Sequence, residues 1–179
     1  MTLRERYQKE IAPALAKEFA LTNPMAVPTL EKVTVSVGLS AKQKDPKFAE
    51  TAETVLTRIT GQKPVKTKAK ISISNFKTRK GQIVGMKVTL RGARAWDFVE
   101  RLVNITYPRV RDFRGISDHC VDKSGNLSYG FAEYLAFPEI RPDEVERLHG
   151  VEVTVTTTAR NREKGLALLR GFGFPFRNA

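Results

Sequence analysis

Side chains able to carry covalent or metal chemistry are few in this chain. It has two histidines and one cysteine, too few for a zinc site with the usual ligand spacing. His119 and Cys120 are adjacent in sequence, so their side chains diverge and cannot pair as base and nucleophile. Asp143, Glu144 and Glu146 stand at an expected helix start, where carboxylates favour the helix dipole. We therefore expect no catalytic site, metal or cofactor, and neither an enzyme nor a small-molecule substrate.

The residues that do form a chemical pattern are cations. The chain of 179 residues has 31 lysines and arginines against 19 acidic residues, a net charge of +12. From Thr54 to Trp96 there is no carboxylate, whereas eleven cations occur. These cations are Arg58, Lys63, Lys66, Lys68, Lys70, Lys77, Arg79, Lys80, Lys87, Arg91 and Arg94. A solvated surface usually mixes both signs, because charges of one sign repel each other. The pattern therefore predicts that a polyanion supplies the counter-charges.

One stretch of this cationic window also carries an aromatic residue. In ISNFKTRKG (residues 73–81), Phe76 is followed by Lys77, Arg79 and Lys80 with no acidic neighbour. Such a ring can stack on a base or a ribose while the cations meet phosphates. Packing of the ring within its own loop is nearly as good an interpretation on chemistry alone.

The periodicity of apolar residues indicates the elements that must position these side chains. Helices are expected at residues 3–19 with a break near Pro13, and at 46–60, 96–107, 143–148 and 161–169. Strict alternation predicts strands at residues 30–38, 68–74, 84–91 and 151–159. Residues 108–130 look irregular. The predicted fold class is α+β, a single domain over residues 1–179. In it, an antiparallel-type sheet has helices packed on one face, and a long basic hairpin loop spans residues about 74–82.

The outward residues of the four predicted strands are almost all hydroxyls and cations. They are Thr34, Ser36, Lys68, Lys70, Ser72, Ser74, Lys87, Thr89, Arg91, Thr154, Thr156 and Thr158. If helices cover the valine face, the other face offers donors that match phosphate and ribose oxygens. A plain solvated sheet is the alternative, since threonine favours strands in any case. The face lacks aromatic platforms for single strands, so we expect it to bind folded RNA by shape and backbone.

Several ordered blocks carry a family resemblance that covers essentially the whole chain. They are GQKPVKTKAK, ISNFKTRKG, GMKVTLRG, PRVRDFRG, FPEI, VTVTTTA and FGFPFR. In this order they resemble bacterial large-subunit ribosomal protein five, the universal ribosomal protein family that binds 5S rRNA. The resemblance implies a structural constituent of the large ribosomal subunit, located in the cytoplasm. At the central protuberance it would bind 5S rRNA and help attach it to the large-subunit rRNA.

The resemblance also implies particular contact residues. The 5S rRNA site would use Ser36, Gly38, Lys63, Thr67, Lys68, Lys70, Thr89 and Arg91. The basic loop would reach the transfer RNA in the P site with Asn75, Phe76, Lys77, Arg79 and Lys80. A weaker candidate is an intersubunit bridge, in which Arg109, Arg111 and Arg114 would meet a small-subunit head ribosomal protein.

Two other classes of function remain as alternatives. An RNA-processing enzyme, or an accessory domain of an RNA-modifying enzyme, would also need a cationic surface, and turnover of a labelled RNA would reveal it. Binding to anionic membranes is disfavoured, because the cations lie on predicted strands rather than on an amphipathic helix. No stretch approaches the ~20 apolar residues of a membrane span. With one cysteine no internal disulfide can form, as expected of a reducing compartment.

Overall fold

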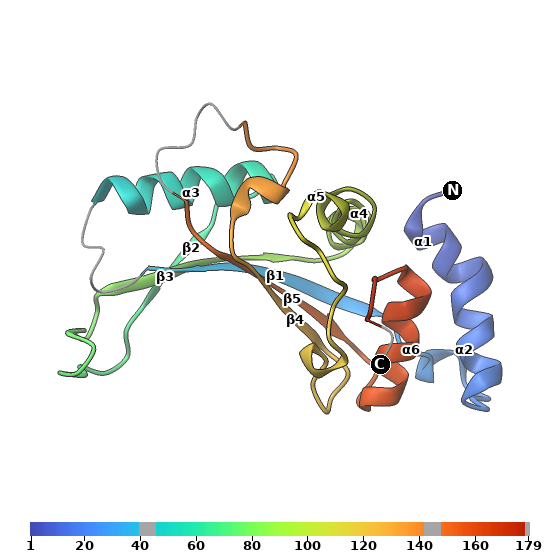
Figure 1. Ribbon diagram of the computed structural model, residues 1–179. Coiled ribbons are helices and arrows are strands. Elements are labelled where there is room, and N and C mark those ends of the chain that lie inside the picture. The colour runs from blue at the N-terminus through green and yellow to red at the C-terminus, as the bar shows by residue number, and fades with distance from the viewer. Residues whose placement is uncertain (40–45, 142–147, 178–179) are drawn as a thin grey trace. The chain divides into compact units, whose positions relative to one another are not determined.

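A five-stranded antiparallel sheet is the centre of the fold (Figure 1). The structure is a computed structural model that describes residues 1–39, 46–141 and 148–177. The strands are β1 (Leu30–Gly38), β2 (Val65–Lys68), β3 (Ile83–Leu90), β4 (Leu127–Phe131) and β5 (Val151–Thr157). Their order in the sheet is β2-β3-β1-β5-β4. The predicted α+β class is confirmed.

The chain divides into two compact units that share these strands. Unit 1 comprises Met1–Val33, Leu90–Tyr129 and Thr154–Ala179. Unit 2 comprises Thr34–Thr89 and Gly130–Val153. That residues 1–179 form a single domain stays a prediction.

Helical segments precede, connect and follow the strands. They are α1 (Leu3–Arg6), the π-helical turn η1 (Tyr7–Ile11), α2 (Ala12–Glu18), α3 (Pro46–Thr60), α4 (Ala93–Arg101), the π-helical turn η3 (Leu102–Thr106), α5 (Tyr107–Arg109) and α6 (Arg162–Phe172). Short 3₁₀ turns occur at Pro24–Ala26, Asp118–Cys120 and Tyr134–Ala136. Within the described ranges, no helix has both the length and the apolar character that crossing a bilayer requires.

Two prolines lie inside helical runs, and a π-helical turn precedes each. The N–H of Ala12 donates to the carbonyl of Tyr7, and the N–H of Tyr107 to that of Leu102. The widened turns place Pro13 and Pro108 in the first turn of the α-segment that follows, where a missing donor is tolerated. The break near Pro13 is therefore a π-helical turn. The expectation that the helix predicted at residues 96–107 ends before Pro108 is wrong, because α5 includes Pro108.

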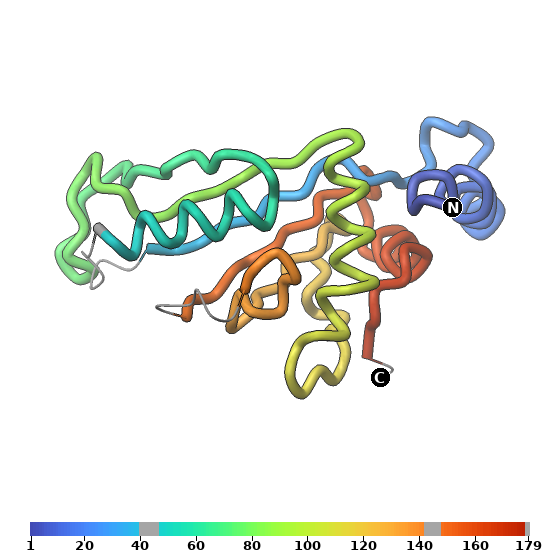
Figure 2. Tube along the Cα trace, turned by 90° about the horizontal axis from the view of Figure 1, so that it is seen from above, coloured from blue at the N-terminus to red at the C-terminus, as the bar shows by residue number. Residues whose placement is uncertain are grey.

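Unit 2 is built from an amphipathic helix that lies over one face of its strands (Figures 1 and 2). The predicted stripe of α3 is buried, as are the alternate residues of β1, β3 and β5. These are Phe48, Ala52, Val55, Leu56 and Ile59 of α3, with Val35, Val37, Met86, Val88, Val151 and Val153 of the strands. Alternation in the sequence therefore predicted the buried face of these strands correctly.

Two strand predictions need correction. The second strand covers residues 65–68 and not 68–74, so Ala69, Ile71 and Ile73 do not form a buried strand face. Ile71 and Ile73 are 66% and 38% exposed. The region 108–130, expected to be irregular, contains the start of β4. Of the predicted helix 143–148, residues 143–147 with the acidic side chains lie outside the described residues, and Leu148 is not helical.

A close approach of two backbones organises part of unit 1. Gly125 lies in a turn in which the Asp122 carboxylate accepts hydrogen bonds from the N–H groups of Ser124 and Asn126, at 2.9 and 2.8 Å. Desolvation raises the pKa of this carboxyl, but the hydrogen bonds outweigh it and hold the pKa below its usual value. Gly165 in the first turns of α6 packs directly on Gly125. Only glycine at both positions permits this contact.

Candidate nucleic-acid interface

The pairing of β2 with β3 defines which side chains face away from α3. Val65 pairs with Lys87 and Thr67 with Gly85, whereas Lys66 pairs with Met86. Directly paired residues point to the same side of a sheet. Met86 is only 1% exposed, so its side is the one that α3 covers. Val65, Thr67, Gly85 and Lys87 therefore lie on the other side.

Lys66 consequently belongs to the covered side and has a partner there. Its Nζ lies 2.9 Å from Oε2 of Glu53 on α3. The hydrogen bond from Lys66 holds the pKa of Glu53 below its usual value; slight desolvation opposes this, and the charges of Lys66 and Lys63 add to it. The prediction that the window's cations lack internal counter-charges is therefore wrong for Lys66, because Glu53 precedes the window by only one residue.

A β-bulge lies opposite the end of β2. Thr67 pairs with Gly85 and Lys68 pairs with Ile83, so Val84 of β3 is the extra, unpaired residue. Because β2 has no extra residue, its side chains continue to alternate, and Lys68 does not share the side of Thr67. Lys68 is exposed at the end of β2.

We call the side of the unit 2 strands turned away from α3 the open face. It comprises Thr34, Ser36 and Gly38 of β1, Val65 and Thr67 of β2, Gly85, Lys87 and Thr89 of β3, and Glu152 of β5. Within the described part of unit 2, no helix lies over this face (Figure 1). Of the predicted outward residues, Thr34, Ser36, Lys87 and Thr89 lie on it, together with one exposed apolar side chain, that of Val65, and one carboxylate.

The eight residues expected to bind 5S rRNA are only partly gathered here. Ser36, Gly38, Thr67 and Thr89 lie on the open face. The other four lie elsewhere: Lys63 in the turn between α3 and β2, Lys68 at the end of β2, Lys70 in the connection after β2, and Arg91 in unit 1. Arg91 forms an exposed ion pair with Glu31 at 3.9 Å, an interaction of little strength in water.

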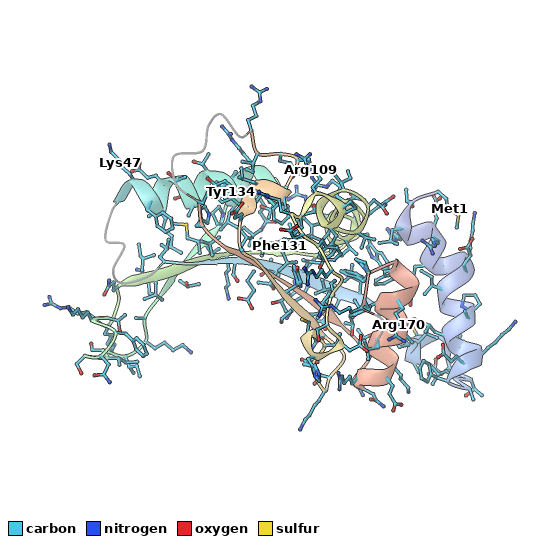
Figure 3. All side chains as sticks on the ribbon, in the orientation of Figure 1. Met1, Lys47, Arg109, Phe131, Tyr134 and Arg170 are labelled. Atoms are coloured by element: carbon cyan, nitrogen blue, oxygen red, sulfur yellow. The ribbon has the colours of Figure 1, made fainter. Side chains whose placement is uncertain are left out.

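Residues 69–82, which connect β2 to β3, form a small hairpin of their own. Ile73 and Thr78 exchange backbone hydrogen bonds of 3.2 Å, and the N–H of Lys77 donates to the carbonyl of Ser74 at 2.9 Å. The turn requires Lys77 at φ 51°. The exposed side chains of this connection spread outward from it (Figure 3).

Side chains stabilise the base of this small hairpin. The N–H of Lys80 donates to Ser72 Oγ at 2.9 Å, and that of Arg79 to Gln82 Oε1 at 3.0 Å. Phe76 at the tip is 69% exposed. Packing of the ring within its loop, the alternative considered from the sequence, is therefore wrong for this structure. The ring and the neighbouring cations are available to a partner.

The three arginines considered for an intersubunit contact lie in unit 1. Arg109 ends α5, and Arg111 and Arg114 are exposed in the turns that follow. The backbone carbonyl of Arg114 accepts a hydrogen bond from Arg177 Nε at 3.0 Å. This hydrogen bond fixes the backbone at Arg114 and does not involve the guanidinium group of Arg114 itself.

The residues first considered for chemistry do not assemble into a site. His119 is exposed and Cys120 is half-buried in the same 3₁₀ turn. Among the residues that the structure describes, no three histidine, cysteine or acidic side chains are grouped so that they could hold a metal ion.

Comparison with known proteins identifies the family. Residues 23–79 match the family described as "Ribosomal protein L5", and residues 83–176 match the model of the C-terminus of the same ribosomal family. Three relatives carry the name "Large ribosomal subunit protein uL5". That of Anaeromyxobacter sp. (strain Fw109-5) is 52% identical over 98% of this chain and 97% of its own. That of Acidovorax sp. (strain JS42) is 49% identical over 98% of both chains.

The third relative comes from another bacterium and is identical to this chain to a similar degree. The protein of Thermotoga maritima is 47% identical over 98% of this chain and 95% of its own. Such identity over nearly the full length, together with two family matches in consecutive parts of the chain, establishes the family. The chain belongs to the uL5 family of large ribosomal subunit proteins.

Proposed function

We propose that the open face binds 5S rRNA and helps attach it to the large-subunit rRNA at the central protuberance. As a member of the uL5 family, the chain is a structural constituent of the large ribosomal subunit and not an enzyme. Its partners are ribosomal RNA and ribosomal proteins. The open face is the surface whose chemistry fits a folded RNA.

The observation that carries this proposal is the set of lysines without an internal counter-charge. Lys87 is exposed on the open face, and Lys68 and Lys70 are exposed at the end of β2 and just after it. Within residues 1–39, 46–141 and 148–177, no carboxylate forms an ion pair with any of the three. Hydroxyls of Thr34, Ser36, Thr67 and Thr89 lie on the open face as well. Ammonium and hydroxyl donors together suit phosphate and ribose oxygens.

The salt dependence of RNA binding tests the proposal. If about five cations meet phosphates, the affinity for 5S rRNA should fall with salt at a log–log slope between about −3.5 and −4.5. The purified protein and a 5S rRNA transcript, titrated at several salt concentrations in a filter-binding assay, give this slope. A slope near zero, or no preference over an unrelated folded RNA of the same length, would contradict the proposal.

The connection between β2 and β3 is proposed to contact the transfer RNA in the P site. Asn75, Phe76, Lys77, Arg79 and Lys80 are all exposed in it. The hairpin hydrogen bonds order the backbone that carries these side chains, with the ring of Phe76 uncovered at the tip. An aromatic ring beside cations is suited to a nucleotide at close range.

Replacing Phe76 by alanine should therefore weaken transfer RNA binding to the P site of assembled ribosomes by about tenfold, since base–aromatic stacking contributes ~1–3 kcal/mol. Binding of 5S rRNA to the isolated protein should not change. Ile71→Ala is the matched control, because Ile71 is an apolar side chain of the same connection and is 66% exposed. An equal loss of both RNAs on Phe76→Ala would mean that the surface is divided differently.

The exposed arginines that follow α5 are proposed to meet a small-subunit head protein and so to contribute to an intersubunit bridge. Arg109, Arg111 and Arg114 supply three cations in six residues. Their unit also contains Arg177, whose side chain fixes the backbone at Arg114. An acidic protein surface is the partner that this cluster fits.

A further inference from the structure

One carboxylate lies on the open face and is not explained by phosphate binding. Among the described residues of unit 2, Glu152 is the acidic residue whose strand position faces away from α3. Val151 and Val153 on either side of it are buried, so its own side chain is directed to the open face. A carboxylate here repels phosphate, and a surface made only to bind RNA backbone would have a cation or a hydroxyl instead.

Ser36 holds this carboxylate in place. Ser36 Oγ on β1 donates to Glu152 Oε2 on the neighbouring β5 at 3.4 Å. In the part of the chain that the structure describes, no lysine or arginine forms an ion pair with Glu152. A carboxylate offers about four acceptor positions. The single long hydrogen bond from Ser36 leaves most of them for a ligand.

The spacing of the sheet separates this acceptor from the lysines. In the strand order, β1 lies between β3 and β5. Neighbouring strands are about 4.8 Å apart, so Lys87 on β3 and Glu152 on β5 are about 10 Å apart across the sheet. Gly38 lies on the same face, and a Cβ added there would have no neighbour within 4 Å. The open face thus has a cationic part and a separate acceptor part.

A folded RNA offers two matching kinds of group. Its phosphates fit the lysines, while the wide, shallow minor groove of an A-form helix displays donors. These donors are ribose 2′-hydroxyls and the guanine N2 amino group. A carboxylate that loses its water on binding must gain a donor, because an unpaired buried charge is costly. The groove donors supply one, whereas the phosphates cannot.

We propose that Glu152, oriented by Ser36, accepts a hydrogen bond from a minor-groove donor of the bound RNA while Lys68 and Lys87 hold the phosphates. This inference rests on the proposed binding of 5S rRNA. It makes Glu152 a specificity-determining residue, because it favours an RNA that presents a donor at one position and disfavours one that presents a phosphate there.

Affinity and salt dependence, measured together, test the role of Glu152. Glu152→Ala should weaken binding of a 5S rRNA transcript about 10- to 100-fold and leave the log–log salt slope unchanged, because no phosphate contact is lost. Glu152→Gln keeps an acceptor oxygen and should lose less. Glu50→Ala on the exposed surface of α3 removes the same charge from the other side of unit 2 and should have no effect. Circular dichroism and thermal unfolding check that each variant is folded.

Analogue interference mapping identifies the donor. The wild type and Glu152→Ala select from pools of the transcript that contain sparse inosine or sparse 2′-deoxynucleotides. Interference by inosine that disappears with Glu152→Ala indicates a guanine amino group, and interference by 2′-deoxynucleotides that disappears indicates a 2′-hydroxyl. If Glu152→Ala binds the transcript equally well, or more tightly with a steeper salt slope, Glu152 does no more than repel phosphates and the inference is wrong. If the wild type itself fails to bind with a salt-dependent affinity, the proposed function fails first.

Discussion

Replacing Gly165 by alanine is expected to lower the free energy of unfolding by about 2–4 kcal/mol. The same change inside an ordinary helix raises stability by up to ~1 kcal/mol, because alanine favours the helix. Here the added Cβ would lie 2.5 Å from the carbonyl oxygen of Gly125 and 2.8 Å from its carbonyl carbon. Both are backbone atoms, so no side-chain rotation relieves the clash.

Neither can the turn at Gly125 move away without loss. Its carbonyl accepts a hydrogen bond from the buried Thr157 Oγ1 at 2.8 Å. The Asp122 carboxylate holds the turn from inside through two backbone N–H groups. Gly125 has φ +85°, a conformation that glycine adopts without cost. Displacing this turn would break hydrogen bonds as well as packing.

Urea unfolding followed by circular dichroism measures the effect of Gly165→Ala. Gly130→Ala is the matched control, since a Cβ at Gly130 would have no neighbour within 4 Å. The control should be neutral or slightly more stable. A Gly165→Ala protein as stable as the wild type would mean that α6 and the Gly125 turn are further apart than the structure has them.

The second large effect is expected on RNA binding. Replacing Lys68, Lys70 and Lys87 together by alanine should make the salt slope for 5S rRNA shallower by about 2.1–2.7. If the affinity extrapolated to 1 M salt is unchanged, the same slope change weakens binding at 0.1 M roughly 100- to 500-fold. Stability should change little, because all three side chains are exposed. Filter binding over a range of salt concentrations measures both quantities.

A control for net charge accompanies this triple variant. Lys9, Lys17 and Lys123 are exposed lysines of unit 1, and their replacement by alanine removes the same total charge. The control should retain nearly all of the wild-type slope. Equal losses in the two triple variants would mean that overall charge, rather than the open face, binds the RNA.

Local patterns predicted the elements whose apolar residues repeat regularly. The alternation at Val33, Val35 and Val37 indicated β1, and the stripe from Phe48 to Ile59 indicated α3, because each buries one continuous face. The final helix was also expected, and Asn161 Oδ1 does accept the N–H of Glu163. Gly173, in the left-handed conformation, ends that helix three residues later than expected.

Sequence patterns led to wrong predictions where the pairing between strands decides which residues form a strand. The run from Lys68 to Ser74 alternates as well as a true strand does. The regular pairing of β2 with β3 nevertheless ends at Lys68, next to the bulge, and the following residues form the small hairpin. The start of β4 was missed because a glycine-containing turn precedes a strand of five residues. The ion pair between Glu53 and Lys66 joins a helix to a strand, which no local pattern indicates.

The bulge opposite Thr67 and Lys68 has a consequence for how the gene can vary. Its surplus residue is Val84 of β3, because Thr67 pairs with Gly85 and Lys68 pairs with Ile83. A single-codon deletion at Val84 would restore even pairing of the two strands, whereas a deletion at Thr67 or Lys68 would increase the mismatch. The effect of a change in length here therefore depends on the strand in which it occurs.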